Sequence, residues 1–262
     1  MSNLERQAAE NLWGHWQGDT CIETLPEACC PADLAAGYRV QRELVAVSGQ
    51  KPVGYKIAAS SQAGQAHLKI THPVYGRLLE NQVIASGDKA KWIDHPMSVA
   101  ELEFAFRFDR DVPERAEPYE MDAVMAHVGA MHIGIELPGS RFVDPAAAGI
   151  AQIIADNASA NIYVLGPKVE GWRDVDLAAH KVKMIIDGEE KTKGQGSDAL
   201  GDPRLALTWL VNELGGQGFP MHRGQLATTG VCGMPVPVFK GQKVIGDFGM
   251  FGKVRVELSF VA

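Results

Sequence analysis

The stretch Val99-Ala100-Glu101-Leu102-Glu103-Phe104-Ala105-Phe106-Arg107-Phe108 alternates between two kinds of side chain for most of its length. Successive side chains of a β-strand point to opposite faces, so this alternation predicts a strand. One predicted face is apolar and contains Leu102, Phe104, Phe106 and Phe108. The other face contains Glu101 and Glu103, which therefore lie on the same side of the strand.

A solvent-exposed strand face produces the same pattern, so Glu101 and Glu103 alone fit ordinary surface carboxylates. Glu136 changes this interpretation, because it lies in the apolar run 133–137. A buried carboxylate must be paired, protonated or bound to a metal. Two carboxylates on one strand and a third on a neighbouring strand suit a hard cation such as Mg²⁺. His132 shares the parity of Glu136, but a packed or surface histidine is its ordinary interpretation.

The rest of the chain mixes helical and strand patterns. Helical spacing of apolar residues predicts helices over 1–17, 31–49, 62–68, 121–131, 146–156 and 203–214. Strand patterns cover 53–58, 75–79, 132–137, 162–165, 225–229 and 253–260, and Asp187-Gly188 predicts the turn of a hairpin over 181–191. Because strands and helices are interspersed, we expect a mixed-sheet α/β or α+β fold.

Composition limits the functional classes. The chain of 262 residues has a net charge of −7 and no run rich in lysine and arginine, which argues against nucleic acid as a partner. No window approaches the roughly 18 apolar residues of a membrane span, and residues 1–17 do not resemble a secretory signal. The four cysteines lack the spacing of a zinc site. We therefore expect a cytoplasmic protein with reduced thiols.

Several motifs, in order along the chain, resemble the hydratase/decarboxylase branch of the fumarylacetoacetate hydrolase superfamily. The two main matches are Glu101-Leu102-Glu103-Phe104-Ala105-Phe106 and Gly134-Ile135-Glu136-Leu137-Pro138-Gly139-Ser140-Arg141. Weaker matches occur at 37–41, 54–57, 155–159, 209–212, 229–230 and 246–247, so the resemblance covers about residues 35 to 258.

The resemblance implies a mixed β-sheet rolled into a barrel-like core with helices around it. We expect a helical N-terminal segment over 1–50 and one compact catalytic domain over 51–262. Members of this family usually form homo-oligomers and act on small 2-oxo or 2-hydroxydienoate acids. Association with other enzymes of the same pathway is a further expectation.

The same resemblance assigns roles to individual residues. It implies that Glu101, Glu103 and Glu136 bind Mg²⁺ or Mn²⁺, and that Lys56 lies at the active site. A lysine there binds the substrate carboxylate, or handles protons if burial lowers its pKa. The expected substrate contacts are Ser159, Asn157, Gln41 and Thr229.

One stretch departs from the family pattern. Thr71 and Val74 stand where acidic residues are common in the family, and His72 lies between them. If one of those acids transfers protons in hydratases, this chain must use another group. The metal site is unaffected by this difference, whereas the reaction depends on it.

Four functions follow from this reading. The first is hydration of a 2-hydroxy-2,4-dienoate to a 4-hydroxy-2-oxo acid in the meta-cleavage catabolism of aromatic compounds. The second is decarboxylation of a 4-oxalocrotonate-type 2-oxo diacid. Hydrolysis of a C–C bond in a 1,3-dicarbonyl ranks lower, because no water-activating His–Glu pair is evident in the N-terminal part. A non-catalytic homologue is the fourth alternative.

Overall fold

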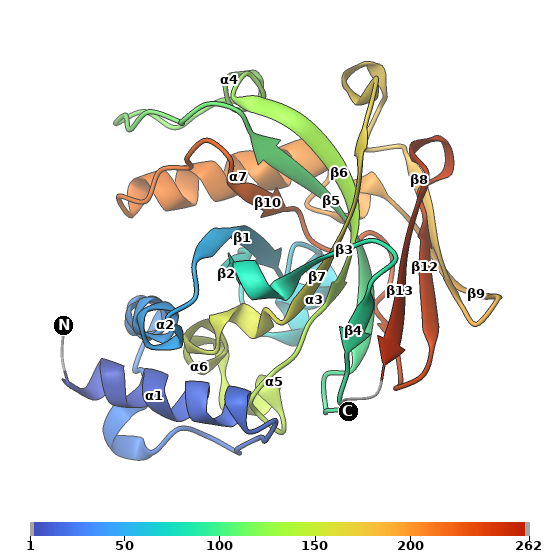
Figure 1. Cartoon of the computed structure of the whole chain (residues 1–262). Coiled ribbons are helices and arrows are strands. Elements are labelled where there is room, and N and C mark those ends of the chain that lie inside the picture. Colours follow the sequence, from blue (N-terminus) through green and yellow to red (C-terminus); the bar gives the residue numbers. More distant parts are fainter. Residues whose placement is uncertain (1–2, 260–262) are drawn as a thin grey trace.

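The computed structural model describes residues 3–259, which form two β-sheets and a set of helices (Figure 1). Residues 1, 2 and 260, at the ends of the predicted first helix and last strand, lie outside this range. Within it, the larger sheet has eight strands: β1 (Pro52–Ala58), β2 (Val74–Leu79), β3 (Val83–Ala85), β5 (Val99–Phe108), β6 (Val128–Leu137), β7 (Ile162–Val169), β10 (Leu226–Thr228) and β11 (Val236–Pro237).

The larger sheet is mixed and curls on itself (Figure 1). Its strand order is β2-β1-β10-β5-β6-β7-β3, and β11 adds to β5. The pairs β1–β10 and β3–β7 are parallel, whereas β5 pairs with β6 and β10 in antiparallel fashion. The predicted mixed fold with a barrel-like sheet is confirmed.

The smaller sheet covers the apolar face of β5. Among the described residues it has five strands: β4 (Lys89–Lys91), β8 (Lys181–Ile186), β9 (Glu189–Gln195), β12 (Lys243–Asp247) and β13 (Lys253–Ser259). The Phe104 ring packs edge-on against the Phe248 ring, and the two ring centroids are 5.4 Å apart. Leu102, Phe104, Phe106 and Phe108 are all buried in the main core, as the alternation predicts.

Helices surround these sheets. They are α1 (Asn3–Gln17), α2 (Leu34–Ser48), α3 (Gln62–His67), α4 (Met121–Met125), α5 (Pro145–Ala148), α6 (Ile150–Ala155) and α7 (Pro203–Gly216). Short 3₁₀ turns occupy η1 (Glu27–Cys29), η2 (Glu80–Gln82), η3 (Asn157–Ser159), η4 (Trp172–Asp174), η5 (Gly196–Asp198) and η6 (Gly249–Phe251). No helix of the described residues is long and apolar enough to cross a membrane.

Helix α2 shows why the sequence folds this way locally. The Asp33 side chain accepts a hydrogen bond from the Ala36 N–H at 2.7 Å and caps the first turn. Gly49 ends the helix in the left-handed conformation. Helices α1, α2 and α6 pack together (Figure 1) around a second apolar cluster that includes Leu12 and Leu44. The division of the chain at residue 50 stays a prediction.

Two predicted helices differ from the structure. The helix predicted over 121–131 is wrong after Met125, because β6 begins at Val128 and pairs with the end of β5. The helix predicted over 146–156 is split in two at Gly149, whose φ is +89°. The predicted hairpin is confirmed as β8–β9, and both Asp187 and Gly188 have positive φ at its turn.

We expect Gly134→Ala to destabilise the protein. A Cβ at residue 134 would lie 2.0 Å from the Tyr163 hydroxyl oxygen and 2.3 Å from the ring carbon that bears it. Overpacking of this kind costs about 1–3 kcal/mol. Urea denaturation measures the change.

Gly14→Ala is the matched control, because a Cβ there meets nothing within 4 Å on the exposed side of α1. It should stabilise the protein by about 0.5–1 kcal/mol. Equal effects of the two substitutions would contradict the crowding at Gly134.

Candidate functional site

Three glutamates meet on one face of the larger sheet, the face opposite the apolar side chains of β5. In the β5–β6 register Glu101 lies opposite Glu136, and Glu103 lies opposite Gly134. Residues directly opposite each other in a sheet share a face, so all three carboxylates point to the same side. One ligand oxygen from each lies within 4.8 Å of the others. Glu103 and Glu136 are fully buried and Glu101 is half-buried, so the alternative of a solvated surface face is excluded.

Lys56 joins this cluster from two strands away. In register, Lys56 of β1 lies opposite Thr228 of β10, which lies opposite Ala105 of β5. Its side chain therefore shares the face of the glutamates, and its Nζ lies 2.9 Å from Glu136 Oε1. The Lys56 side chain is only 4% exposed. The ammonium group of Lys56 thus faces three carboxylates in a buried space.

Burial and like charge change the acidity of these groups. Burial, with the Glu136 charge, raises the pKa of Glu101 to about 7, although Lys56 lowers it. Burial also raises the pKa of Glu103 well above its ordinary value, and the charges of Glu136 and Glu101 raise it further. Burial alone would lower the pKa of Lys56, but the three glutamates outweigh it and raise that pKa. Lys56 is therefore an ammonium in the free protein.

Unpaired oxygens make this cluster suitable for a cation. Glu103 Oε2 accepts the Gly230 N–H at 3.1 Å, and Glu136 Oε1 faces Lys56. The other oxygen of each carboxylate, Glu103 Oε1 and Glu136 Oε2, is buried without a hydrogen-bond partner. Buried acceptors normally have partners, so two orphans in one cluster indicate a missing ligand. Carboxylate oxygens are the donors that Mg²⁺ and Mn²⁺ prefer, and the three glutamates could hold either ion.

The remainder of this face is apolar and tightly filled. Beyond the glutamates, Leu78, Ala105, Tyr163 and Leu226 form a separate buried cluster. At Gly76, a Cβ would lie 2.2 Å from the backbone oxygen of Asn157, so only glycine permits this close approach. The polar side chains on this face of the sheet therefore gather around the glutamates and Lys56.

Buried hydroxyls whose oxygens lack a partner occur on the same elements. They belong to Ser60, Ser159, Tyr163 and Thr228. Thr228 lies opposite Lys56 in register, and a Cβ at Gly230 would lie 2.0 Å from Ser60 Oγ. Ser159 is predicted from its motif, whereas no sequence pattern marks Ser60, Tyr163 or Thr228. The sequence predicts a strand over 225–229. The place of Thr228 beside Lys56 would also require knowledge that this strand pairs with β1.

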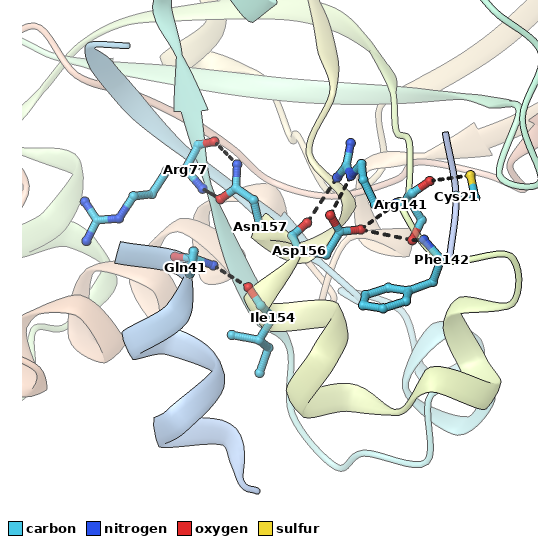
Figure 2. A network of polar contacts seen from close by, with 9 residues as sticks. Cys21, Gln41, Arg77, Arg141, Phe142, Ile154, Asp156 and Asn157 are labelled. Carbon is cyan, nitrogen blue, oxygen red and sulfur yellow. Dashed lines mark hydrogen bonds and ion pairs between the residues drawn. The ribbon is translucent and has the colours of Figure 1, made fainter. Parts of the chain in front are cut away.

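Asn157 belongs to a turn with an unusual backbone. The φ angles of Asn157, Ala158 and Ser159 are +54°, +50° and +58°, a conformation that non-glycine residues rarely adopt. The Asn157 side chain accepts the Arg77 N–H at 2.7 Å and donates to the Arg77 carbonyl at 2.8 Å (Figure 2). The amide thus ties the turn to β2, beside the Gly76 that pairs with Lys56.

A buried ion pair holds the start of this turn (Figure 2). The Arg141 guanidinium donates to the Asp156 carboxylate and to its backbone carbonyl. The Ser140 hydroxyl and the Arg141 N–H donate to the same carboxylate, at 3.0 Å and 2.9 Å. Arg141 also lies 3.8 Å from the centre of the Trp16 ring. Helix α1 therefore reaches the turn through Arg141.

Two other predicted contact residues also bond to the backbone. The Gln41 side chain donates to the carbonyls of Tyr75 and Ile154, at 2.9 Å and 3.2 Å, and Figure 2 shows the second of these bonds. Thr229 donates its hydroxyl to the Phe104 carbonyl at 3.1 Å. As substrate contacts, Gln41, Asn157, Thr229 and Ser159 stay predictions.

The remaining sequence candidates make no hydrogen bond or ion pair with the three glutamates among the described contacts. His132 is half-buried, and its Nδ1 lies 3.1 Å from the Gly166 carbonyl oxygen. Thr71 and His72 are exposed, and Val74 is fully buried at the start of β2. This segment therefore contributes no carboxylate. All four cysteines are free thiols.

Comparisons with known proteins show which family this chain resembles along its length. The chain is 30% identical over 241 residues to the 2-keto-4-pentenoate hydratase of Paraburkholderia phymatum, covering 91% of each chain. No family model matches. This similarity along nearly the whole chain makes the protein an enzyme of the hydro-lyase type and sets aside the non-catalytic alternative.

Solved structures have the same fold. Two structures of 4-oxalocrotonate decarboxylase from Pseudomonas putida G7 cover 97% of this chain. One is complexed with magnesium and adipate (24% identity, 97% of that chain, TM-score 0.86). The other is complexed with calcium and acetate (25% identity, 96% of that chain, TM-score 0.85). Fumarylpyruvate hydrolase from Pseudomonas aeruginosa covers 79% of this chain and 89% of its own at 12% identity, with a TM-score of 0.60.

The hydratase similarity, the shared fold and the carboxylate cluster agree with the motif resemblance. The chain belongs to the 2-keto-4-pentenoate hydratase family, and its fold is that of 4-oxalocrotonate decarboxylase and fumarylpyruvate hydrolase.

Proposed function

We propose that this hydro-lyase converts 2-hydroxypenta-2,4-dienoate to 4-hydroxy-2-oxopentanoate with Mg²⁺ or Mn²⁺ as its cofactor. The substrate class is that in the name of the hydratase relative. The observation that supports the proposal best is the buried cluster of Glu101, Glu103 and Glu136 with the Lys56 ammonium beside it. The reaction belongs to the meta-cleavage catabolism of aromatic compounds.

The three glutamates would hold the cation through carboxylate oxygens. When bound, the cation would supply a Lewis acid to the substrate's carboxylate and 2-oxygen. The unpaired oxygens of Glu103 and Glu136 support this assignment. A cation would also remove the repulsion among three buried acids, which Lys56 alone does not balance.

Lys56 would act as a charge and a hydrogen-bond donor. Its pKa is raised by the glutamates, so it stays protonated and is not a general base in the free protein. Glu136 fixes the position of the ammonium at 2.9 Å. A lysine ammonium has three N–H groups, which leaves donors for the substrate carboxylate.

Hydration adds one water to the dienoate. The 2-hydroxyl loses its proton and C5 gains one, which gives a conjugated 2-oxo-3-enoate. Water then adds its oxygen to C4, and C3 gains a proton. We propose that the buried hydroxyls of Ser60, Ser159 and Thr228 hold the substrate or the water, because they are donors without partners.

Decarboxylation of a 4-oxalocrotonate-type diacid is the second candidate. The observation that favours it is the absence of a carboxylate at the exposed Thr71 and the buried Val74. A carboxylate at either position would transfer protons during hydration. Decarboxylation needs no such base, because the departure of CO₂ itself leaves the electron pair on the substrate carbon. Incubation with 4-oxalocrotonate separates the two: release of CO₂ supports the decarboxylase, and water addition to the dienoate alone supports the hydratase.

Three further expectations are part of the proposal. We propose a homo-oligomer, and the exposed apolar side chains of Met234, Phe239 and Met250 support it. Location in the cytoplasm and association with enzymes of the same pathway follow from the expected role in catabolism.

We expect Glu103→Gln to abolish cation-dependent hydration. The amide keeps the shape of the side chain but removes the charge that would hold the ion. Loss of several kcal/mol of Lewis-acid stabilisation corresponds to about a 10³-fold decrease in kcat/KM. Steady-state assays with 2-hydroxypenta-2,4-dienoate and Mg²⁺ measure it.

The control is Glu117→Gln, which removes an exposed carboxylate in the loop between β5 and α4 and should leave kcat/KM unchanged. A Glu103→Gln protein with full activity would refute the proposed metal site.

Cation binding should release protons near neutral pH. Glu101 has a pKa of about 7, and that of Glu103 is raised, so the cation must displace protons from the cluster. The affinity for Mg²⁺ should therefore increase between about pH 6 and about pH 8. Isothermal titration calorimetry in two buffers of different ionisation enthalpy measures the number of protons released.

The cation-free protein should show the opposite dependence in its stability. Since the folded pKa of Glu101 is raised, the folded chain retains a proton that the unfolded chain has lost. Its free energy of unfolding should therefore fall as pH increases from about 4.5 to about 7. Affinity and stability that do not change with pH would contradict the burial of these acids.

A further inference from the structure

Tyr163 has a buried hydroxyl for which the hydratase reaction, as described above, provides no role. Tyr163 is fully buried on β7, and its Oη has no hydrogen-bond partner. Its ring lies in the apolar cluster with Leu78, Ala105 and Leu226. A phenylalanine would fill this apolar site without placing a hydroxyl where nothing accepts it. Among residues 3–259 of the cation-free protein, this oxygen therefore lacks the partner that a buried hydroxyl needs.

Gly134 determines where the hydroxyl lies. Tyr163 is opposite Glu136 in the β6–β7 register, so both side chains share one face of the sheet. The oxygen occupies the position of the missing side chain of Gly134, 2.0 Å from where a Cβ would be. Gly134 in turn lies opposite Glu103 on β5. The hydroxyl thus lies beside Glu103, on the side facing β6 and β7.

The hydrogen bonds of the glutamates leave room for one more donor. Glu103 Oε2 is bonded to the Gly230 N–H, which comes from the β10 side. Glu136 Oε1 is bonded to Lys56. Glu103 Oε1 makes no well-aligned hydrogen bond, although the Thr228 hydroxyl approaches the carboxylate from β10 and, against the effect of burial, lowers its pKa. On the opposite side, the nearest side-chain position on β6 contains the Tyr163 hydroxyl.

We infer that Tyr163 is a positioning residue of the cation site, whose hydroxyl donates a hydrogen bond to the Glu103 carboxylate when the cation is bound. This inference rests on the proposed metal site of the hydratase. Two donors, Gly230 from one side and Tyr163 from the other, would then fix the carboxylate plane. Outer hydrogen bonds of this kind orient ligand side chains toward a metal.

The environment keeps Tyr163 in the donor form. Burial raises the pKa of its hydroxyl well above the ordinary value, and the charges of Glu103 and Glu136 raise it further. Only the protonated hydroxyl can donate to a carboxylate.

Tyr163→Phe tests the inference, because it removes the oxygen and keeps the ring. Titration calorimetry with Mg²⁺ and with Mn²⁺ should show a Kd about 10- to 100-fold higher than in the unchanged protein. The Tm of the cation-free protein should stay the same or increase, because a buried hydroxyl without a partner has been removed. The two readouts thus change in different directions.

The control is Tyr119→Phe, which removes a hydroxyl bonded to the Pro113 carbonyl on the surface. Its Kd for either ion should be unchanged. An unchanged Kd in Tyr163→Phe would overturn the inference, and so would a lower Tm of its cation-free form, which would indicate a purely structural hydroxyl.

The experiment separates this inference from the proposed function. If the unchanged protein binds Mg²⁺ and Glu103→Gln does not, the metal site stands and Tyr163→Phe decides the role of Tyr163 alone. If the unchanged protein binds neither ion, the proposed metal site and the role of Tyr163 both fail.

Discussion

Antiparallel pairing of β5 and β6 in one particular register is the constraint on which the rest of the site depends. It places Glu101 opposite Glu136 and leaves Gly134 opposite Glu103. A shift of one residue in either strand would turn these carboxylates into the apolar core and the core phenylalanines into the site. The apolar side chains of β5 prevent this shift, because they pack against the smaller sheet. The packing of the apolar face of β5 therefore also fixes the positions of the carboxylates on its other face.

Burial of three acids is unfavourable for a protein without its ligand. Desolvation raises the pKa of Glu101 and Glu103, and among residues 3–259 Lys56 is the charged group that compensates it. A site of this kind is less stable in isolation than an apolar core of the same volume. Strain and unpaired charge in a folded protein are typical of functional positions. The buried acids are thus the kind of position at which a functional site is expected.

Only part of this arrangement could be predicted from the sequence. Alternation in 99–108 was sufficient for the shared face of Glu101 and Glu103, because side-chain parity is a local property of a strand. Their burial was not predictable, because it comes from β1, β7 and β10, which are distant in sequence. Tyr163 was missed for the same reason. Its position depends on the β6–β7 register, which shifts irregularly between His132 and Gly134.

Predictions from local spacing were also wrong where a segment pairs with a strand that is distant in sequence. Residues 121–131 have helical spacing, yet Val128 and the residues after it extend β6 along β5. Gln41 and Asn157 were predicted from motifs without knowledge of their partners. In the structure their amides bond to the backbone of β2 and of the segment beside it. Motif matching finds such residues but does not distinguish a ligand contact from a support for the chain.

The turn at Asn157, Ala158 and Ser159 has a consequence for how this part of the chain is ordered. Three successive left-handed residues each cost roughly 1–3 kcal/mol, a strain that folding itself must overcome. Arg141 and Arg77 hold the turn from two sides. A segment that the fold has already ordered loses little further conformational entropy in a later binding event. The cost of this conformation therefore falls on folding, not on binding.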